Sequence, residues 1–295
     1  MASLSTLLSV TLKLRTEWKA FAGNGTVSLI AQIRVSQARV QRTWLSFPIW
    51  FHRVRCRFVQ LLVSVRNVIE ADAALAGGAD IIDVKEPARG SLGMAAPETI
   101  QAIAERCRRQ SAFSPCSAAL GELPEWSRMA AVREQRECLD WAQGLSYLKV
   151  GLAGTLSLPD WLDQWLTLRS LFPGTVQWVA VAYADASRAM SPSIERMAEV
   201  AAQTACRVLL LDTFQKDSST LFDWVSPEQL CRLRAQCRDT GLRLALAGRL
   251  DASHLSVLRT IDPDLLAVRG AVCAAGERTS AVAAERVRAL RMEMA

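Results

Sequence analysis

The residues from 60 to 295 alternate between two patterns of apolar and polar positions. Short apolar runs bounded by polar residues or glycine are typical of strands buried on both faces of a sheet. Eight such runs occur, at 60–65, 79–84, 116–120, 145–152, 176–183, 207–214, 242–248 and 265–272. The stretches between them carry helical patterns, so the sequence predicts an α/β fold in which eight strands alternate with helices.

Eight strand–helix units over about 235 residues match the (β/α)₈ or TIM barrel, whose typical size is ~250 residues. The helix pattern at 226–241 has clear ends, because Ser226 can cap it, Gln229 completes a capping box and Gly241 can close it. A doubly wound open sheet is the rival fold, and it normally has a glycine-rich turn after its first strand. Residues 60–71 contain no glycine, which favours the barrel.

Charge separates the first 60 residues from the rest. They hold nine basic side chains against Glu17 alone, whereas the remaining 235 residues hold 26 basic and 28 acidic side chains. The formal net charge of +6 therefore comes from the N-terminal segment, and the slightly acidic remainder gives no indication of nucleic-acid binding. We expect a barrel domain at 59–295 behind a basic extension at 1–58.

The extension has no clear periodicity. Its three tryptophans lie among arginines, which would suit an RNA-binding or membrane-surface arm. The favoured interpretation is an extension that is disordered, or one that results from an upstream start, with Val54 or Val59 as the alternative first residue.

The eight cysteines are scattered, and no pair has the C-x₂-C spacing of a zinc site. With only two histidines in the chain, no metal site is expected. Several cysteines lie in apolar patterns and suit small core positions, which indicates a reducing, cytoplasmic setting. No run reaches the roughly 20 apolar residues that a membrane span needs, and the N-terminus has no basic region ahead of its apolar residues, as a signal peptide would have.

Functional groups of this barrel type gather at the C-terminal ends of the strands. Side chains two apart on a strand share a face, so Asp83 and Lys85 point the same way. The polar residues at the predicted strand ends are Ser64, Arg66, Asp83, Lys85, Ser117, Glu122, Lys149, Tyr183, Asp185, Asp212, Lys216, Arg249 and Arg269.

Three lysines in this set indicate amine chemistry. From residue 60 onward the chain has no other lysine, since its remaining basic groups are arginines. A desolvated or crowded lysine can lose its proton, and its neutral amine attacks carbonyls to form a Schiff base. Asp83 and Asp212 can hold the remaining charge and relay protons. For any one lysine the alternative is a structural ion pair, but three at functional strand ends favour catalysis.

The ends of the last two predicted strands suggest which chemical group of the substrate is bound. Gly248 and Gly270 end them and allow close backbone approach, and loops at this place commonly bind phosphate in the barrel fold. Arg249 or Arg269 would add positive charge. Lysine amines beside a phosphate site predict carbon–carbon bond chemistry on a phosphorylated carbonyl compound.

Six motifs in order resemble one family, the (5-formylfuran-3-yl)methyl phosphate synthases, over roughly residues 60–290. They are "GGADIIDVKEPARGSLG" (77–93), "YLKVGL" (147–152), "AYADA" (182–186), "LLDTFQKDSSTLFD" (210–223), "LALAGRL" (244–250) and "VRGAVC" (268–273). The resemblance implies a (β/α)₈ fold, no metal or organic cofactor, and condensation of two glyceraldehyde 3-phosphate molecules with loss of one phosphate and two waters. The product is the furan precursor of methanofuran-type one-carbon carriers.

By motif, Lys85 in "DVKEP" corresponds to the family's Schiff-base lysine and Lys149 in "YLKVGL" to its proton acceptor. Asp212 and Lys216 in "DTFQKD" match a further catalytic pair, and Asp83 is expected to set the protonation of Lys85. The basic extension has no counterpart in the family.

Two alternatives remain open. Another Schiff-base (class I) aldolase acting on a phosphorylated sugar would share Lys85, and a nucleic-acid or membrane-surface binder would use the basic extension. The favoured expectation is a homo-oligomeric enzyme whose partner is a small phosphorylated triose, without nucleic acid or membrane.

Overall fold

The computed structural model describes residues 15–23, 26–34, 59–109, 114–128 and 140–295. The chain divides into two compact units, Met1–Val54 and Arg55–Ala295. The described residues of the first unit form two antiparallel strands, β1 (Arg15–Gly23) and β2 (Thr26–Arg34). The sequence did not predict this pairing. Most of the extension lies outside the described residues, so its expected character stays a prediction.

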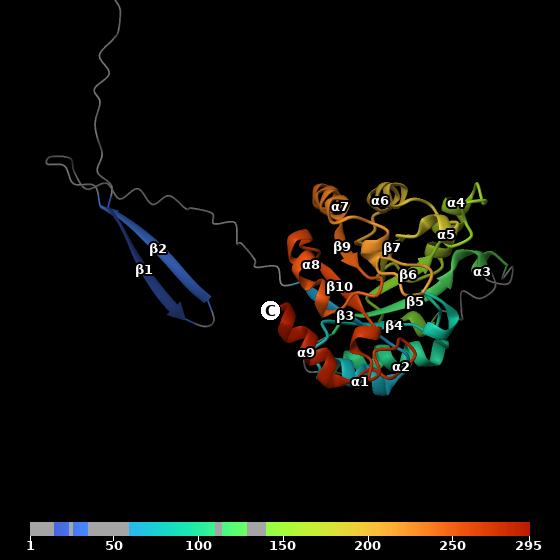
Figure 1. Ribbon diagram of the computed structural model, residues 1–295, viewed down its shortest axis with the longest axis horizontal. Coiled ribbons are helices and arrows are strands. Elements are labelled where there is room, and N and C mark those ends of the chain that lie inside the picture. Colours follow the sequence, from blue (N-terminus) through green and yellow to red (C-terminus); the bar gives the residue numbers. More distant parts are fainter. Residues whose placement is uncertain (1–14, 24–25, 35–58, 110–113, 129–139) are drawn as a thin grey trace, which may run out of the picture. The chain divides into compact units, whose positions relative to one another are not determined.

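The second unit contains a closed barrel of eight parallel strands, in the order β10-β3-β4-β5-β6-β7-β8-β9 (Figure 1). The strands are β3 (Gln60–Val65), β4 (Ile81–Val84), β5 (Cys116–Glu122), β6 (Tyr147–Gly151), β7 (Gln177–Tyr183), β8 (Val208–Asp212), β9 (Arg243–Leu246) and β10 (Leu265–Val268). Each lies within or overlaps a predicted apolar run. The predicted (β/α)₈ barrel is therefore confirmed.

Helices connect successive strands and surround the barrel in Figure 1. They are α1 (Val68–Ala76), α2 (Pro97–Arg108), α3 (Leu123–Arg128), α4 (Trp161–Ser170), α5 (Ala186–Ala189), α6 (Ile194–Gln203), α7 (Pro227–Asp239), α8 (Leu255–Ile261) and α9 (Ala284–Met294). In the described ranges, none is both long and apolar enough to cross a membrane.

Helix α7 begins and ends as its sequence indicates. Ser226 accepts a hydrogen bond from the backbone N–H of Gln229, whose side chain accepts from Ser226 N in return, which completes the predicted capping box. Gly241 follows the helix with a φ of +73°, a conformation that glycine adopts without steric cost.

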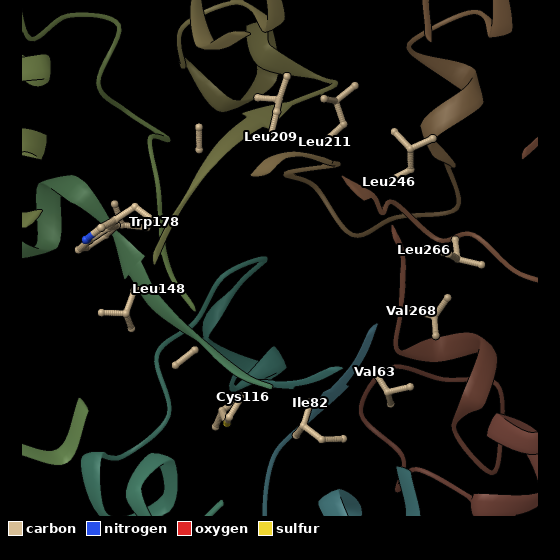
Figure 2. Packing of buried hydrophobic residues seen from close by; sticks show 14 of the residues in the cluster. Val63, Ile82, Cys116, Leu148, Trp178, Leu209, Leu211, Leu246, Leu266 and Val268 are labelled. Carbon is tan, nitrogen blue, oxygen red and sulfur yellow. The ribbon is translucent and has the colours of Figure 1, made fainter. Parts of the chain in front are cut away.

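Alternation along the strands gives the barrel two distinct faces. Outward-facing side chains form the main core between strands and helices, and Figure 2 shows them pointing away from the ring of strands. Its labelled residues are Val63, Ile82, Cys116, Leu148, Trp178, Leu209, Leu211, Leu246, Leu266 and Val268. The alternate residues of the same strands face inward, where an apolar floor forms from Leu62, Ile81, Ala119, Val179, Val181, Leu210, Ala245, Leu265 and Ala267.

The described cysteines are free thiols, and most belong to the core as the sequence predicts. Buried examples are Cys107, Cys116, Cys206, Cys237 and Cys273, while Cys231 is half-buried. The other two, Cys56 and Cys138, lie outside the described residues.

A chain that begins at Val59 should fold and melt at the same temperature as the 295-residue chain. The strand–helix alternation starts at residue 60, the charge balance changes there, and the barrel belongs to a unit separate from the first 54 residues. Thermal unfolding of both chains, followed by circular dichroism, tests this expectation. Aggregation of the shorter chain, or a clearly lower melting temperature, would show that the extension contributes to the fold.

Candidate functional site

The inward-facing polar residues meet at the C-terminal ends of the strands. Asp83 lies on β4 and Lys85 directly follows it, Lys149 lies on β6, and Asp212 ends β8 with Lys216 four residues later. All five line one cavity of about 880 Å³. The strand period of two brings the β4 and β6 residues to one face, as the sequence predicted for Asp83 and Lys85.

Asp83 and Lys149 form a buried ion pair. Lys149 Nζ donates to Asp83 Oδ1 over 2.7 Å, and Ser64 Oγ donates to Asp83 Oδ2 over 2.9 Å. The two charged side chains are 4 % and 0 % exposed, so water contributes little to their solvation. Burial alone would raise the pKa of Asp83, but the charges of Lys149 and Lys85 and the two hydrogen bonds lower it. Asp83 is therefore a carboxylate.

A second pair joins Asp212 and Lys216. The distance between Lys216 Nζ and Asp212 Oδ1 is 2.6 Å, and Nζ also lies within hydrogen-bond distance of the carbonyl oxygen and hydroxyl of Thr213. Burial lowers the pKa of Lys216, and Asp212 opposes that shift. The pKa of Asp212 is lowered: burial alone would raise it, but the charges of Lys216 and Lys85 outweigh burial.

Asp185 holds the loop that carries Lys216. Its two carboxylate oxygens accept hydrogen bonds from the backbone N–H groups of Phe214 (2.6 Å) and Gln215 (3.0 Å). The sequence placed Asp185 among the strand-end residues without a role, and the structure gives it a structural one at the base of this loop.

Lys85 differs from the other two lysines. In the described part of the chain, its Nζ makes no hydrogen bond or ion pair, although the residue is only 9 % exposed. Burial lowers its pKa to about 7; the charges of Asp212 and Asp83 oppose this shift, and those of Lys216 and Lys149 add to it. The direct partner of Asp83 is Lys149, so Asp83 acts on Lys85 through its charge and not through a bond.

A segment after β4 crosses the barrel mouth. Ser91 Oγ donates to Asp212 Oδ2 over 3.1 Å and to the carbonyl of Thr213 over 3.0 Å, although β4 and β8 lie on opposite sides of the ring. The next residue, Leu92, is buried in the barrel interior, and its carbonyl accepts from Gly121 N. Sequence reasoning missed this contact, since a serine between glycines reads as an ordinary turn.

Glu122 and Tyr183 pair with each other and not with the lysines. Tyr183 Oη donates to Glu122 Oε1 over 2.5 Å, and Ala153 N donates to Oε2 over 2.8 Å. Burial raises the pKa of both side chains. A Cβ at Gly151 would collide with both, so this glycine makes the pair possible. Within the described residues, neither Glu122 nor Tyr183 lines the lysine cavity.

Arg269 is fully engaged inside the protein. Its guanidinium pairs with both oxygens of Glu70 and also donates to the backbone carbonyls of Ser64, Arg278 and Ser280. These bonds use all five N–H groups of the arginine. Each therefore already has an acceptor among the described residues, and direct phosphate contact by Arg269 stays a prediction.

Gly248 and Gly270 line the cavity where the sequence placed them. Gly248 has a φ of +102°, which favours glycine, and a Cβ at Gly270 would lie 3.3 Å from the carbonyl oxygen of Gly276. Among the described residues, the backbone N–H groups of Gly248, Arg249, Gly270 and Ala271 have no acceptor. Four unpaired donors beside a cavity suit an anion.

Arg278 is a cavity residue that the sequence did not indicate. It lies between β10 and α9, lines the cavity, and donates from Nη2 to the carbonyl of Gly90 over 2.8 Å. Burial lowers its pKa, and the charge of Asp212 opposes that shift. Its sequence context, "GERTS", is typical of a solvated loop, and only the fold brings it to the cavity.

No group of three or more histidine, cysteine, aspartate or glutamate side chains is arranged to hold a metal ion within the described ranges.

The fold and the site together define this protein as a (β/α)₈-barrel protein with buried lysine–aspartate pairs at the C-terminal ends of its strands. Its fold is shared by 3-hexulose-6-phosphate synthase from Salmonella typhimurium, with a TM-score of 0.54 and 14 % identity over 80 % of this chain and 98 % of that one. Phosphoribosyl anthranilate isomerase from Thermus thermophilus gives a TM-score of 0.51 and 19 % identity, again over 80 % of this chain and 98 % of that one.

The chain belongs to the 4-HFC-P synthase family, whose model matches residues 61–291. It is 35 % identical over 222 residues to the (5-formylfuran-3-yl)methyl phosphate synthase of Methanothermobacter thermautotrophicus, covering 75 % of this chain and 92 % of that one. The protein of the same name from Methanocaldococcus jannaschii is 36 % identical over 226 residues, with the same coverage. These relatives are named as synthases, and the chain is an enzyme.

Proposed function

We propose that this enzyme condenses two molecules of glyceraldehyde 3-phosphate into (5-formylfuran-3-yl)methyl phosphate through a Schiff base on Lys85. The observation that carries the proposal is Lys85 itself, a buried amine without a partner in the described residues and with a pKa of about 7. About half of such amines are neutral at neutral pH, and the neutral amine is the form that attacks a carbonyl. The names of the relatives supply the product.

The two ion pairs around Lys85 suit proton transfer. Lys149, held by Asp83, is the group we assign as proton acceptor and donor on the bound triose. Asp212 and Lys216 form a second pair whose charges influence the pKa of Lys85 directly. With Lys85 between two such pairs, protons can move on and off the substrate without water as the carrier.

The reaction balances without an oxidant or a reductant. Two trioses supply the six carbons of the furan aldehyde and its hydroxymethyl group, and one of the two phosphates is retained. The other phosphate leaves together with two waters, so the enzyme would be a carbon–oxygen lyase acting on phosphates. We place this step in the biosynthesis of methanofuran-type one-carbon carriers.

The unpaired backbone N–H groups after β9 and β10 are the proposed site for one substrate phosphate. Those of Gly248 and Gly270 lie at glycines, so no Cβ keeps the anion from the backbone. This position agrees with the common phosphate site of the (β/α)₈ fold.

Incubation with glyceraldehyde 3-phosphate, followed by mass analysis, tests the function. The expected product has the mass of the furan aldehyde phosphate and the ultraviolet absorbance of a conjugated aldehyde, and inorganic phosphate should be released in equal amount. A linear sugar phosphate without that absorbance would instead identify another class I aldolase. Protein carrying Lys85→Arg serves as the control for non-enzymatic reaction of the triose.

A further inference from the structure

The guanidinium of Arg278 has N–H donors that lack an acceptor among the described residues. One N–H of Nη2 donates to Gly90, and no further acceptor for this side chain is found in the described part of the protein. Four of the five N–H groups of the fork are therefore unpaired on a half-buried side chain that lines the cavity. Two parallel N–H groups match two phosphate oxygens, which is the arrangement arginine uses to bind phosphate.

The surrounding bonds hold Arg278 in place. Arg269, fixed by its pair with Glu70, donates to the backbone carbonyls of Arg278 and Ser280 on either side of Thr279. Arg66 Nη1 donates to the carbonyl of Thr279 over 3.2 Å. A loop anchored at three consecutive carbonyls presents its side chain at a defined place, which reduces the ordering cost of binding a ligand.

The charges at the inner end of the cavity favour an anion. Asp83 is paired with Lys149 and Asp212 with Lys216, so these four charges largely cancel. Arg278 forms no ion pair with any described residue. Its guanidinium is near enough to Lys216 for the two positive charges to repel, and an anion between them would remove that repulsion.

The place of this guanidinium differs from that of the unpaired backbone N–H groups. Those groups follow β9 and β10, whereas Arg278 reaches Gly90, the neighbour of the Ser91 that bonds to Asp212. The guanidinium therefore lies beside the segment after β4 that crosses the barrel mouth. A cavity of about 880 Å³ is near the upper end of the range for drug-sized ligands, and a single triose phosphate would leave much of it empty.

We propose that Arg278 binds the phosphate of the second triose, at a site separate from the backbone site after β9 and β10. The inference rests on the proposed function, because a condensation of two phosphorylated trioses requires two phosphate groups to be held at once. In this arrangement Arg269 is a positioning residue that keeps the Arg278 loop in place, and Arg278 is the arginine that touches the substrate.

Titration calorimetry with glycerol 3-phosphate tests the second site, since this probe carries the phosphate but no aldehyde and cannot react with Lys85. The 295-residue protein should bind two molecules per chain. Arg278→Ala should weaken one of the two sites by at least ~10-fold, because charge-assisted hydrogen bonds are lost, and leave the other unchanged. Arg278→Lys should give an intermediate affinity at the same site, since lysine keeps the charge without the fork.

Arg288→Ala is the matched control. Arg288 also donates one guanidinium N–H to a backbone carbonyl, that of Ala76 over 3.1 Å, but it is exposed and does not line the cavity. This variant should bind two molecules with unchanged affinities. Melting curves verify that each variant is folded, and Arg278→Lys provides the answer if Arg278→Ala does not fold.

Two results would overturn the second site: a single binding event in the parent protein, or two unchanged events in both Arg278 variants. Furan formation is measured in an assay separate from the binding of glycerol 3-phosphate. Loss of one probe site in Arg278→Ala without furan formation by the parent would refute the proposed reaction and leave the phosphate site standing. Furan formation together with unchanged probe binding in the variants would refute only the role of Arg278.

Discussion

Replacing Lys85 by arginine should abolish turnover, while borohydride added to the unaltered enzyme with its substrate should trap a covalent adduct on Lys85. The guanidinium stays protonated at any accessible pH and cannot form an imine. Lys85, with a pKa near 7, can form one at neutral pH. Peptide mapping of the reduced adduct by mass spectrometry identifies the modified lysine.

The pH dependence of adduct formation provides a second test of the role of Lys85. Below pH 7 Lys85 is mainly protonated, so the rate of adduct formation should fall as the pH drops through about 7 and level off above it. An adduct found on Lys216 alone would refute the assignment of the nucleophile. So would measurable imine trapping on the Lys85→Arg protein.

Removing the amine of Lys149 should lower the turnover number by ~10²–10⁴-fold, the usual contribution of a general acid–base group. The buried pair with Asp83 adds a second effect that the sequence did not predict. Lys149→Ala leaves Asp83 buried without its counter-ion, and breaking a buried pair costs about 3–5 kcal/mol. The variant should therefore melt at a lower temperature than the parent.

A double variant separates the two effects. Lys149→Met with Asp83→Asn removes both charges, and Ser64 can still donate to the amide oxygen at position 83. Thermal stability should recover toward that of the parent, whereas the turnover number should stay low. If turnover in Lys149→Ala remains within a few-fold of the parent, Lys149 is structural and another group moves the proton.

The barrel could be predicted because its determinants are local. Buried runs such as 60–65 and the capping signals around Ser226 specify strands and helices one at a time, and their alternation leaves few arrangements. The sequence also placed Lys85, Lys149 and Asp212 at the strand ends, where the structure has them lining one cavity.

Pairings between distant elements could not be predicted in the same way. Asp83 is two residues from Lys85, but its bond is to Lys149, 66 positions further along the chain. Ser91 meets Asp212 from the opposite side of the ring. Such contacts depend on how loops cross the barrel mouth. The local pattern of apolar and polar residues does not predict the path of these loops.

Arg269 and Arg278 illustrate the same limit. Arg269 follows a strand end and is the obvious candidate for a phosphate, but a glutamate from α1 and three carbonyls use all of its donors. Arg278 lies in a polar loop nine residues later, and four of its five guanidinium N–H groups have no acceptor among the described residues. The difference lies in tertiary hydrogen bonding, which sequence composition does not encode.

The scarcity of lysine in this barrel has a practical consequence for chemical labelling. Every lysine from residue 60 onward lines one cavity. An amine-directed reagent labels most proteins at many surface lysines, but it can modify lysine side chains of the barrel only at this site. Acylating reagents need the neutral amine, and Lys85 is the lysine with a pKa of about 7 and no partner in the described residues. Within the barrel, a general-purpose fluorescent ester would thus serve as a site-directed reporter, and peptide mapping would separate this label from label on Lys13, Lys19 and the N-terminal amine. Protection of Lys85 by a bound phosphorylated sugar would then measure occupancy without any assay of catalysis.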